Sequence, residues 1–313
     1  MTETLAIGAY TEIDERSLEA DLGALRAQTL DEALALPEET RSAITAIAYK
    51  GHSAFGGDAM EAFPKLGLVA NFGVGYDAID VDAARTRGIA VTNTPDVLND
   101  DVADLAVAML LMQGRRMVQG DAHVRSGAWA RGEAFPLNRK MSGATVGILG
   151  LGRIGHAIAT RLAAFGMELH YWSRSPKETP AGWTHHADPM DLARAVDILV
   201  VSLVGGPETE GMVSAGMLRV LGGEGVVVNI SRGSTIEEAA LLDALESGRI
   251  AGAALDVFAS EPEIDPRFAS LGNVVLQPHQ GSGTHATRAA MGRLQRDNIA
   301  AFHAGRALLT RVN

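Results

Sequence analysis

Short apolar runs rich in β-branched residues alternate with Ala- and Leu-rich segments of helical periodicity along the chain. This alternation is typical of βα units that build a parallel sheet. In the first half, strands are expected at Leu5–Tyr10, Ile44–Lys50, Gly67–Phe72 and Ile89–Asn93. Helices are expected between them at Asp14–Ala27, Gly57–Phe63 and Asp80–Arg87. The pattern therefore predicts an α/β unit in this half.

The second half repeats this rhythm with six apolar segments. Strands are expected at Thr145–Leu149, Glu168–Trp172, Asp197–Leu203, Gly225–Ile230, Ala251–Val257 and Asn273–Gln277. Six such strands are what a complete doubly wound dinucleotide-binding domain needs. The turn-rich segment Thr94–Asp101 leads into a helix expected at Asp101–Arg116 and indicates a crossing between two domains. Thr284–Ala304 predicts one long closing helix, which could return to the first domain.

Gly150, Gly152 and Gly155 form a G-x-G-x-x-G sequence directly after the first strand of the second half, and an amphipathic helix is expected at Ile154–Phe165. This context, rather than the glycines alone, indicates a dinucleotide-binding turn. The first glycine permits the tight turn, the second lets the backbone approach a pyrophosphate, and the third lets the helix pack on the strand. The helix N-terminus offers N–H groups to the phosphates. The alternative is a glycine-rich turn without a ligand.

The end of the next strand bears on which dinucleotide binds. NAD sites usually place Asp or Glu there, but this chain has Ser173, Arg174 and Ser175. Arginine presents a permanently charged planar fork that matches a 2′-phosphate, and the serines and nearby Lys177 add donors. We therefore predict NADP(H) in preference to NAD(H). The alternative is that Arg174 is a solvated loop cation.

Three further polar segments follow strands of the second half: Asn229–Gly233, Leu255–Pro262 and Gln277–Ser282. Open α/β sheets bind ligands at the carboxyl edge, where these segments are expected. Hydride delivery to a ketone leaves an alkoxide that must gain a proton, and histidine is a natural acid for that step.

We therefore assign the acid/base to His279, its carboxylate partner to Glu261 and the clamp for the substrate carboxylate to Arg232. Each residue alone is more often structural or solvated. Their joint appearance in a dinucleotide domain favours the catalytic interpretation.

Composition narrows the function further. The 313-residue chain has no cysteine, which excludes thiol catalysis, disulfides and cysteine-ligated zinc and fits a reducing compartment. A net charge of −11 argues against nucleic-acid binding by a general basic surface. No signal-peptide pattern opens the chain, and its most apolar stretches, such as Ile198–Val204, are too short to span a membrane. We expect a cytoplasmic protein with no metal ion, nucleic-acid partner or membrane partner.

In this order, the segments resemble the D-2-hydroxyacid dehydrogenase family, and within it the glyoxylate/hydroxypyruvate reductases, from about Leu66 to Thr287. Asn71–Asp77 resembles the family's substrate loop, and Val91–Leu111 its crossing into the cofactor domain. GLGRIG resembles its phosphate turn. NISRG, LDVFASEP and PHQGS resemble its catalytic Arg, Glu and His segments.

The resemblance implies two flavodoxin/Rossmann-like doubly wound α/β domains. The smaller, substrate domain is expected to be discontinuous, from residues 1–97 plus 286–313, with a dinucleotide-binding domain at 98–285. A homodimer through the cofactor domain is also implied. Trp129 matches a family tryptophan on the dimer-side arm, and plain packing is an equally weighted alternative.

Residue roles follow from the same resemblance. The backbone N–H groups of Val74 and Gly75 are expected to hold the substrate carboxylate. Ile230 is expected near the nicotinamide, and Asp256 at its carboxamide. The residues expected at the pyrophosphate are Leu151, Gly152, Arg153 and Ile154.

Ser173–Ser175 departs from the NAD-type members of the family and resembles the NADPH-using reductases. Two further departures stand out. Val204–Gly206 replaces a Pro-Leu-Thr sequence near the adenine side, and Gln280 replaces a more commonly apolar residue beside the histidine. No regulatory domain is expected after Asn313, which argues against a phosphoglycerate dehydrogenase.

The sequence therefore predicts NADPH-dependent reduction of small 2-oxo acids to D-2-hydroxy acids, with glyoxylate and hydroxypyruvate favoured. One alternative is a dehydrogenase for a bulkier 2-oxo acid. The other is a dinucleotide-sensing corepressor on the same fold, although the long extra tail expected of that group is missing. The intact Arg, Glu and His set favours turnover.

Overall fold

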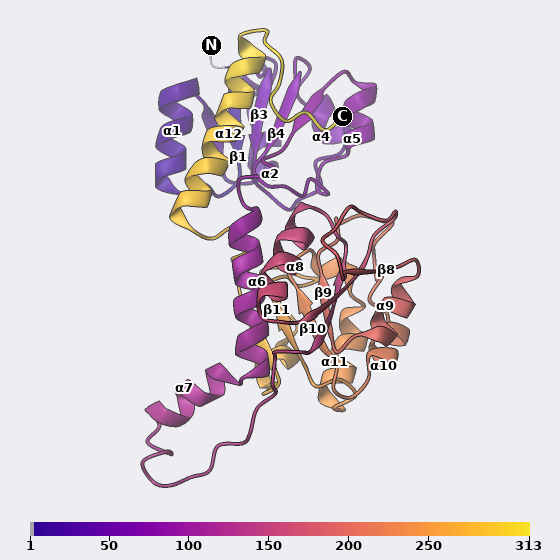
Figure 1. Cartoon of the computed structure of the whole chain (residues 1–313). Helices are drawn as coiled ribbons and strands as arrows, with labels where there is room; N and C mark the ends of the chain where they lie inside the picture. The colour runs from indigo at the N-terminus through magenta and orange to yellow at the C-terminus, as the bar shows by residue number, and fades with distance from the viewer. Residues whose placement is uncertain (1–2) are drawn as a thin grey trace. The chain divides into compact units, whose positions relative to one another are not determined.

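The computed structural model describes residues 3–313 and divides into two compact units. The first joins the chain up to Leu98 with Thr284–Asn313, and the second is Asn99–Gly283. Each unit is a parallel sheet with helices on both faces (Figure 1). The two doubly wound α/β folds predicted from the sequence are confirmed, and so is the discontinuity of the smaller one.

The smaller unit holds a five-stranded sheet in the order β2-β1-β3-β4-β5, which is the flavodoxin-like order. Its strands are β1 (Thr4–Ile7), β2 (Leu25–Ala27), β3 (Ala46–Tyr49), β4 (Leu68–Asn71) and β5 (Ala90–Thr92). Its helices are α1 (Glu12–Leu22), α2 (Leu30–Leu34), α3 (Glu38–Arg41), α4 (Gly57–Glu61), α5 (Val81–Thr86) and α12 (His285–His303). The closing helix α12 lies beside α1 and packs on β3 and β4 (Figure 1).

The larger unit holds a seven-stranded sheet in the order β12-β11-β10-β9-β6-β7-β8. Its strands are β6 (Thr145–Leu149), β7 (Glu168–Trp172), β8 (Thr184–His186), β9 (Ile198–Val201), β10 (Val226–Asn229), β11 (Gly252–Leu255) and β12 (Val274–Leu276). The first six in chain order reproduce the dinucleotide-binding order 3-2-1-4-5-6, and β12 extends one edge.

Helices cover both faces of this sheet. They are α6 (Asn99–Gly114), α7 (Met117–Arg125), α8 (Arg153–Ala164), α9 (Pro189–Ala195), α10 (Ala215–Leu221) and α11 (Glu238–Glu246), with short 3₁₀ helices at Gly233–Thr235 and Pro266–Ser270. Helices α6 and α8 pack together on one face, and α9, α10 and α11 follow one another on the other (Figure 1). Strands β9, β10 and β11 are buried along their whole length, which explains their continuous apolar runs.

Three sequence predictions of secondary structure need correction. The helix expected at Asp14–Ala27 ends at Leu22, because Gly23 takes a left-handed conformation (φ +58°) and terminates it. Leu25–Ala27 then forms β2 beside β1. The six strands expected in the second half are seven, because Thr184–His186 pairs with β7 despite its polar sequence. Helix α7 was also not expected, since it carries no buried side chain.

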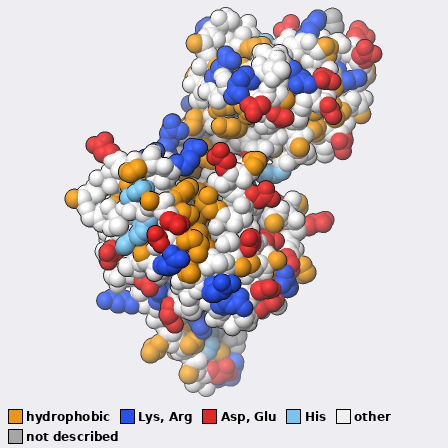
Figure 2. Space-filling view, turned by 90° about the vertical axis from the view of Figure 1, so that its right-hand side faces the viewer, with side chains coloured by type: hydrophobic (Ala, Val, Ile, Leu, Met, Phe, Trp, Pro, Cys, Tyr) orange, Lys and Arg blue, Asp and Glu red, His pale blue; other side chains and the backbone are white. Residues whose placement is uncertain are grey.

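The surface carries both charge signs. Acidic and basic side chains are mixed on the face seen in Figure 2, with apolar side chains between them. Within residues 3–313, none of the helices has the length and apolar character needed to cross a membrane.

Candidate active site

The predicted acid/base and its carboxylate partner are in direct contact in the larger unit. Nδ1 of His279 lies 2.7 Å from Oε2 of Glu261, and the other carboxylate oxygen, Oε1, accepts the Phe258 N–H at 2.9 Å. Both residues follow strands of the same parallel sheet, His279 after β12 and Glu261 after β11. The carboxylate fixes the ring orientation and makes Nδ1 the protonated nitrogen. Proton exchange with a ligand then falls to Nε2.

The backbone of His279 is strained. Its φ is +53°, in the left-handed region that side-chain-bearing residues seldom adopt. Such a conformation costs on the order of 1–3 kcal/mol and persists where surrounding contacts hold it. Here the His279 N–H donates to the Asp256 carbonyl at 2.9 Å.

Asp256 holds the loop that carries His279. Its carboxylate is buried and accepts the N–H groups of Gln280 at 2.6 Å and Gly281 at 2.8 Å. Burial raises the pKa of the Asp256 carboxyl, although these two hydrogen bonds oppose the rise. This positioning role of Asp256 was not predicted from the sequence. The sequence does hold an indication of this role, because Asp256 directly follows a buried strand, where a carboxylate needs hydrogen-bond partners to be stable.

Arg232 follows β10 in a turn whose backbone is held by hydrogen bonds from neighbouring side chains. The buried Asn229 side chain donates to the Arg232 carbonyl at 2.9 Å and accepts the Ser231 N–H at 3.0 Å. The Thr235 hydroxyl also donates to the Arg232 carbonyl, at 2.6 Å. The guanidinium reaches back to the Ser231 carbonyl at 2.8 Å. Asn229 is a further positioning residue that the sequence analysis did not single out.

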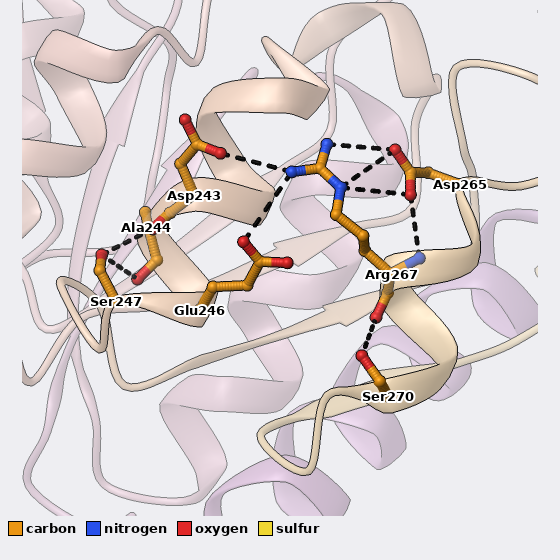
Figure 3. Close-up of polar contacts among 7 residues, drawn as sticks. All are labelled: Asp243, Ala244, Glu246, Ser247, Asp265, Arg267 and Ser270. Atoms are coloured by element: carbon orange, nitrogen blue, oxygen red, sulfur yellow. Dashed lines mark hydrogen bonds and ion pairs between the residues drawn. The ribbon is translucent and has the colours of Figure 1, made fainter.

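The segment that carries Glu261 is held to α11 by a hydrogen bond and by ion pairs. The Ala259 N–H donates to Glu238 of that helix at 2.8 Å. Further along, Arg267 lies 3.1 Å from Asp265 and 3.4 Å from Asp243 of α11 (Figure 3). These exposed ion pairs contribute little to stability. They do link both ends of the Glu261 loop to one helix.

The glycine turn has the geometry that a dinucleotide pyrophosphate needs. Gly150 has φ +104°, and a Cβ on Gly155 would lie 2.2 Å from the Gly150 carbonyl oxygen, so both positions require glycine. A Cβ on Gly152 would meet no atom within 4 Å, which leaves open space at the N-terminus of α8. Leu151 is buried, Arg153 is exposed and Ile154 is half-buried. The turn thus fits the predicted pyrophosphate site.

The residues that follow β7 differ in burial: Ser173 is buried, whereas Arg174, Ser175 and Lys177 are exposed. Ser173 is buried, and its hydroxyl donates to the Ser175 carbonyl at 2.7 Å, so it closes the turn. The Arg174 side chain is 86% exposed and lies 3.7 Å from the Glu208 carboxylate. Ser175 and Lys177 are exposed beside it. Arg174 is therefore placed on the surface with an acidic neighbour that the sequence analysis did not identify.

The predicted carboxylate-binding loop lies in the smaller unit, after β4. The Asn71 side chain donates to the carbonyls of Gly73 at 3.2 Å and Gly75 at 2.9 Å, and Asn93 donates to the Val74 carbonyl at 2.9 Å. Within residues 3–313, the N–H groups of Val74 and Gly75 have no hydrogen-bond acceptor. Two adjacent donors on a fixed loop suit a carboxylate.

Residues 107–281 match the model of the D-isomer specific 2-hydroxyacid dehydrogenase NAD binding domain. The chain is 44% identical over 300 residues to glyoxylate/hydroxypyruvate reductase A HPR2 of Arabidopsis thaliana, covering 95% of each protein. It is 45% identical over 271 residues to a 2-ketogluconate reductase of Gluconobacter oxydans, covering 86% of each.

Among solved structures, it resembles an NADPH-dependent glyoxylate/hydroxypyruvate reductase from Sinorhizobium meliloti in complex with NADP and malonate. The TM-score is 0.93 at 42% identity, over 100% of this chain and 97% of that one.

The chain belongs to the D-isomer specific 2-hydroxyacid dehydrogenase family. It is an oxidoreductase that uses a nicotinamide dinucleotide. The family predicted from the sequence is confirmed.

Proposed function

We propose that this enzyme reduces small 2-oxo acids to D-2-hydroxy acids with NADPH, and that glyoxylate and hydroxypyruvate are the favoured substrates. The observation that carries this proposal is the 2.7 Å contact between His279 and Glu261 at the carboxyl edge of a dinucleotide-type sheet. Relatives that cover most of the chain are named glyoxylate reductases and a glyoxylate/hydroxypyruvate reductase.

Each residue of the proposed active site has its own role in the reduction. A nicotinamide dinucleotide, when bound, would supply the hydride. The N–H groups of Val74 and Gly75 and the guanidinium of Arg232 bind the substrate carboxylate and orient the ketone. His279 donates a proton from Nε2 to the oxygen that gains charge, and Glu261 stabilises the imidazolium before that transfer.

The two units take different parts in this proposal. The larger one, predicted as residues 98–285, binds the dinucleotide along its glycine turn, with Ile230 near the nicotinamide. The smaller one, predicted as 1–97 plus 286–313, carries the substrate loop. Asp256 holds the histidine loop with both carboxylate oxygens, and a contact with the carboxamide would add to this role.

NADP(H) is the proposed cofactor because no carboxylate follows β7 at the ribose position and Arg174 is exposed there. The Ser173 hydroxyl supports the turn rather than the phosphate. NAD(H) remains the alternative. Titration of the protein with each reduced cofactor, followed by fluorescence, tests this part directly, and tighter binding of NADH would contradict it.

A bulkier 2-oxo acid is the second candidate substrate. A hydroxyphenylpyruvate reductase of Plectranthus scutellarioides is 45% identical over 281 residues, and the relatives named glyoxylate reductase are similar to the chain to about the same degree. Initial rates with glyoxylate, hydroxypyruvate, phenylpyruvate and 2-ketogluconate decide between the two classes. Chiral analysis of the products tests the D configuration. If no 2-oxo acid is reduced, the dinucleotide-sensing alternative is favoured.

We propose a cytoplasmic homodimer formed through the arm that follows α6. The apolar side chains Met117, Val118, Val124 and Leu137 of this arm are exposed within the chain. The Trp129 side chain is 71% exposed, so it is not packed within its own chain and is available for contact with a second copy. An apolar surface of this kind is typical of a protein interface.

A further inference from the structure

Two cations lie together at the carboxyl edge of the smaller sheet, outside the residues assigned to catalysis. Lys50 directly follows β3, and Arg288 lies in the first turn of α12. The Lys50 ammonium is 5.0 Å from the centre of the Phe72 ring and 5.3 Å from that of Tyr10. The Arg288 guanidinium is 5.9 Å from the Phe72 ring centre. The Phe72 ring is therefore shared by both cations.

The aromatic rings hold this arrangement in place. Tyr10 and Phe72 are buried and pack edge to face, with ring centres 5.8 Å apart. The Tyr10 hydroxyl is tied to the buried Gln295 side chain of α12, whose amide also donates to the Ala70 carbonyl of β4 at 2.7 Å. Burial raises the pKa of Tyr10, so its phenol stays neutral. Tyr10 therefore positions Lys50 without neutralising it.

The acids nearby are engaged elsewhere. Asp14 accepts the Thr11 hydroxyl at 2.8 Å, and Glu15 pairs with Arg26. In the part of the chain that the structure describes, no carboxylate lies within 4.0 Å of the Lys50 ammonium. Burial and the neighbouring Arg288 lower the pKa of Lys50, although Asp14 and Glu15 oppose this. A half-buried ammonium beside a second cation gains from an anion placed between them.

Lys50 and Arg288 lie beside the loop that is proposed to bind the substrate carboxylate, so the anion between them would belong to the substrate. Ligands of open α/β sheets bind at the carboxyl edge, and Phe72 immediately precedes Gly73 in the loop proposed to hold the substrate carboxylate. That loop already offers two N–H donors to one carboxylate. Lys50 and Arg288 add positive charge next to it.

We propose that Lys50 and Arg288 form a subsite for a second carboxylate, at the end of the substrate remote from the 2-oxo acid group. The enzyme then accepts 2-oxo dicarboxylic acids in addition to small monoacids. This inference rests on the proposed 2-oxo acid reductase function. In the competing interpretation, the cations only cover the rings, and a distal charge makes no difference to the rate.

The test compares 2-oxoglutarate with 2-oxopentanoate, which have the same chain length and differ in the terminal charge. The wild type is expected to show the higher kcat/KM with 2-oxoglutarate. In Lys50→Met, kcat/KM for 2-oxoglutarate falls about 10- to 100-fold, mainly through KM, because one charge-assisted contact is lost. The values for 2-oxopentanoate and glyoxylate change less than about threefold. Lys50→Arg retains most of the preference because it keeps the charge.

Lys65→Met is the matched control, since Lys65 is an exposed lysine that precedes β4 at the opposite edge of the same sheet. Thermal melts of each variant check folding. Equal losses for the two substrates in Lys50→Met, or a wild type that prefers 2-oxopentanoate, would overturn the subsite.

Glutarate binding, measured by calorimetry on the wild type and Lys50→Met, separates this inference from the proposed function. A wild type that reduces no 2-oxo acid contradicts the reductase proposal. Binding of glutarate that weakens in Lys50→Met still supports an anion subsite in that case, and absent or unchanged binding contradicts it.

Discussion

The Glu261 carboxylate bridges its own loop and the catalytic ring: Oε2 lies 2.7 Å from His279 Nδ1 while Oε1 accepts the Phe258 N–H. Glu261 therefore fixes both the tautomer and the direction of the imidazole. Glu261 and His279 are 18 residues apart in sequence and follow two different strands, β11 and β12.

Replacing the carboxylate should impair catalysis more than binding. We expect Glu261→Gln to lower kcat about 10²-fold with little change in KM, because the amide no longer stabilises the imidazolium. Steady-state kinetics with NADPH and glyoxylate provide the measurement. Glu263→Gln, an exposed neighbour in the same loop, is the control and should retain activity. Equal activity of the two variants would show that Glu261 has no part in proton transfer.

The cofactor preference should reside largely in Arg174. Arg174→Ala is expected to weaken NADPH binding about tenfold and to leave NADH binding nearly unchanged, since only the former carries a 2′-phosphate. Dissociation constants from fluorescence titration measure both. Arg194→Ala removes an exposed arginine of α9 and controls for net charge. A loss that is the same for both cofactors would argue against a phosphate contact.

The Glu208 carboxylate beside Arg174 should weaken that contact. Glu208→Gln is expected to tighten NADPH binding several-fold, because the competing ion pair at 3.7 Å is removed. The gain should shrink at high salt, since both groups are exposed. Titrations at low and high ionic strength measure this, and an affinity for NADPH that does not rise at low salt would contradict it.

Acid stability of the larger unit should depend on Asp197. Its carboxylate accepts both the N–H and the hydroxyl of Thr145, at 3.0 and 2.9 Å. Although desolvation by burial raises it, these hydrogen bonds and Arg139 leave the pKa of Asp197 below its ordinary value. The stabilisation is therefore complete above the unfolded pKa of about 3.9 and is lost as the pH falls through the lower, folded value.

Asp197→Ala should thus cost about 1 kcal/mol at pH 7 and less near pH 3. Urea unfolding across this pH range gives the measurement. Glu178→Ala, an exposed loop change, serves as the control. A difference between wild type and Asp197→Ala that does not shrink on acidification would contradict the assignment.

Association of two chains should depend on the arm after α6. Trp129→Glu combined with Leu137→Glu places two charges among exposed apolar side chains and should convert a dimer to a monomer. Analytical ultracentrifugation at several concentrations reads this out. Val204→Glu, at an exposed apolar residue of a different loop, should leave the assembly intact. A wild type that sediments as a monomer would remove the dimer proposal.

Much of the fold and of the candidate site could be predicted from the sequence because short sequence motifs determine it. The glycine turn is one such motif, since steric constraints require glycine at positions 150 and 155. The catalytic segments are another, because parallel strands bring their carboxyl ends to one edge. Strand β8 was missed because Thr184–His186 has no apolar pattern, and it forms only by pairing with β7.

Other features depend on contacts distant in sequence. The cluster around Lys50 joins the edge-to-face rings of Tyr10 and Phe72 with Arg288, and only the folded sheet and α12 bring these residues together. The hydrogen bonds of Asp256 to the amides of Gln280 and Gly281 are likewise a tertiary effect. Neither can be obtained from spacing alone, since loop conformation decides both.

The most direct test is kcat/KM for reduction of glyoxylate by NADPH in the wild type and in His279→Ala, with NADPH binding measured on both proteins. We expect the wild type to form glycolate and NADP⁺ in equal amounts. We expect His279→Ala to bind NADPH normally while its kcat/KM falls at least about 10²-fold. Undiminished turnover in His279→Ala would show that His279 is not the proton donor.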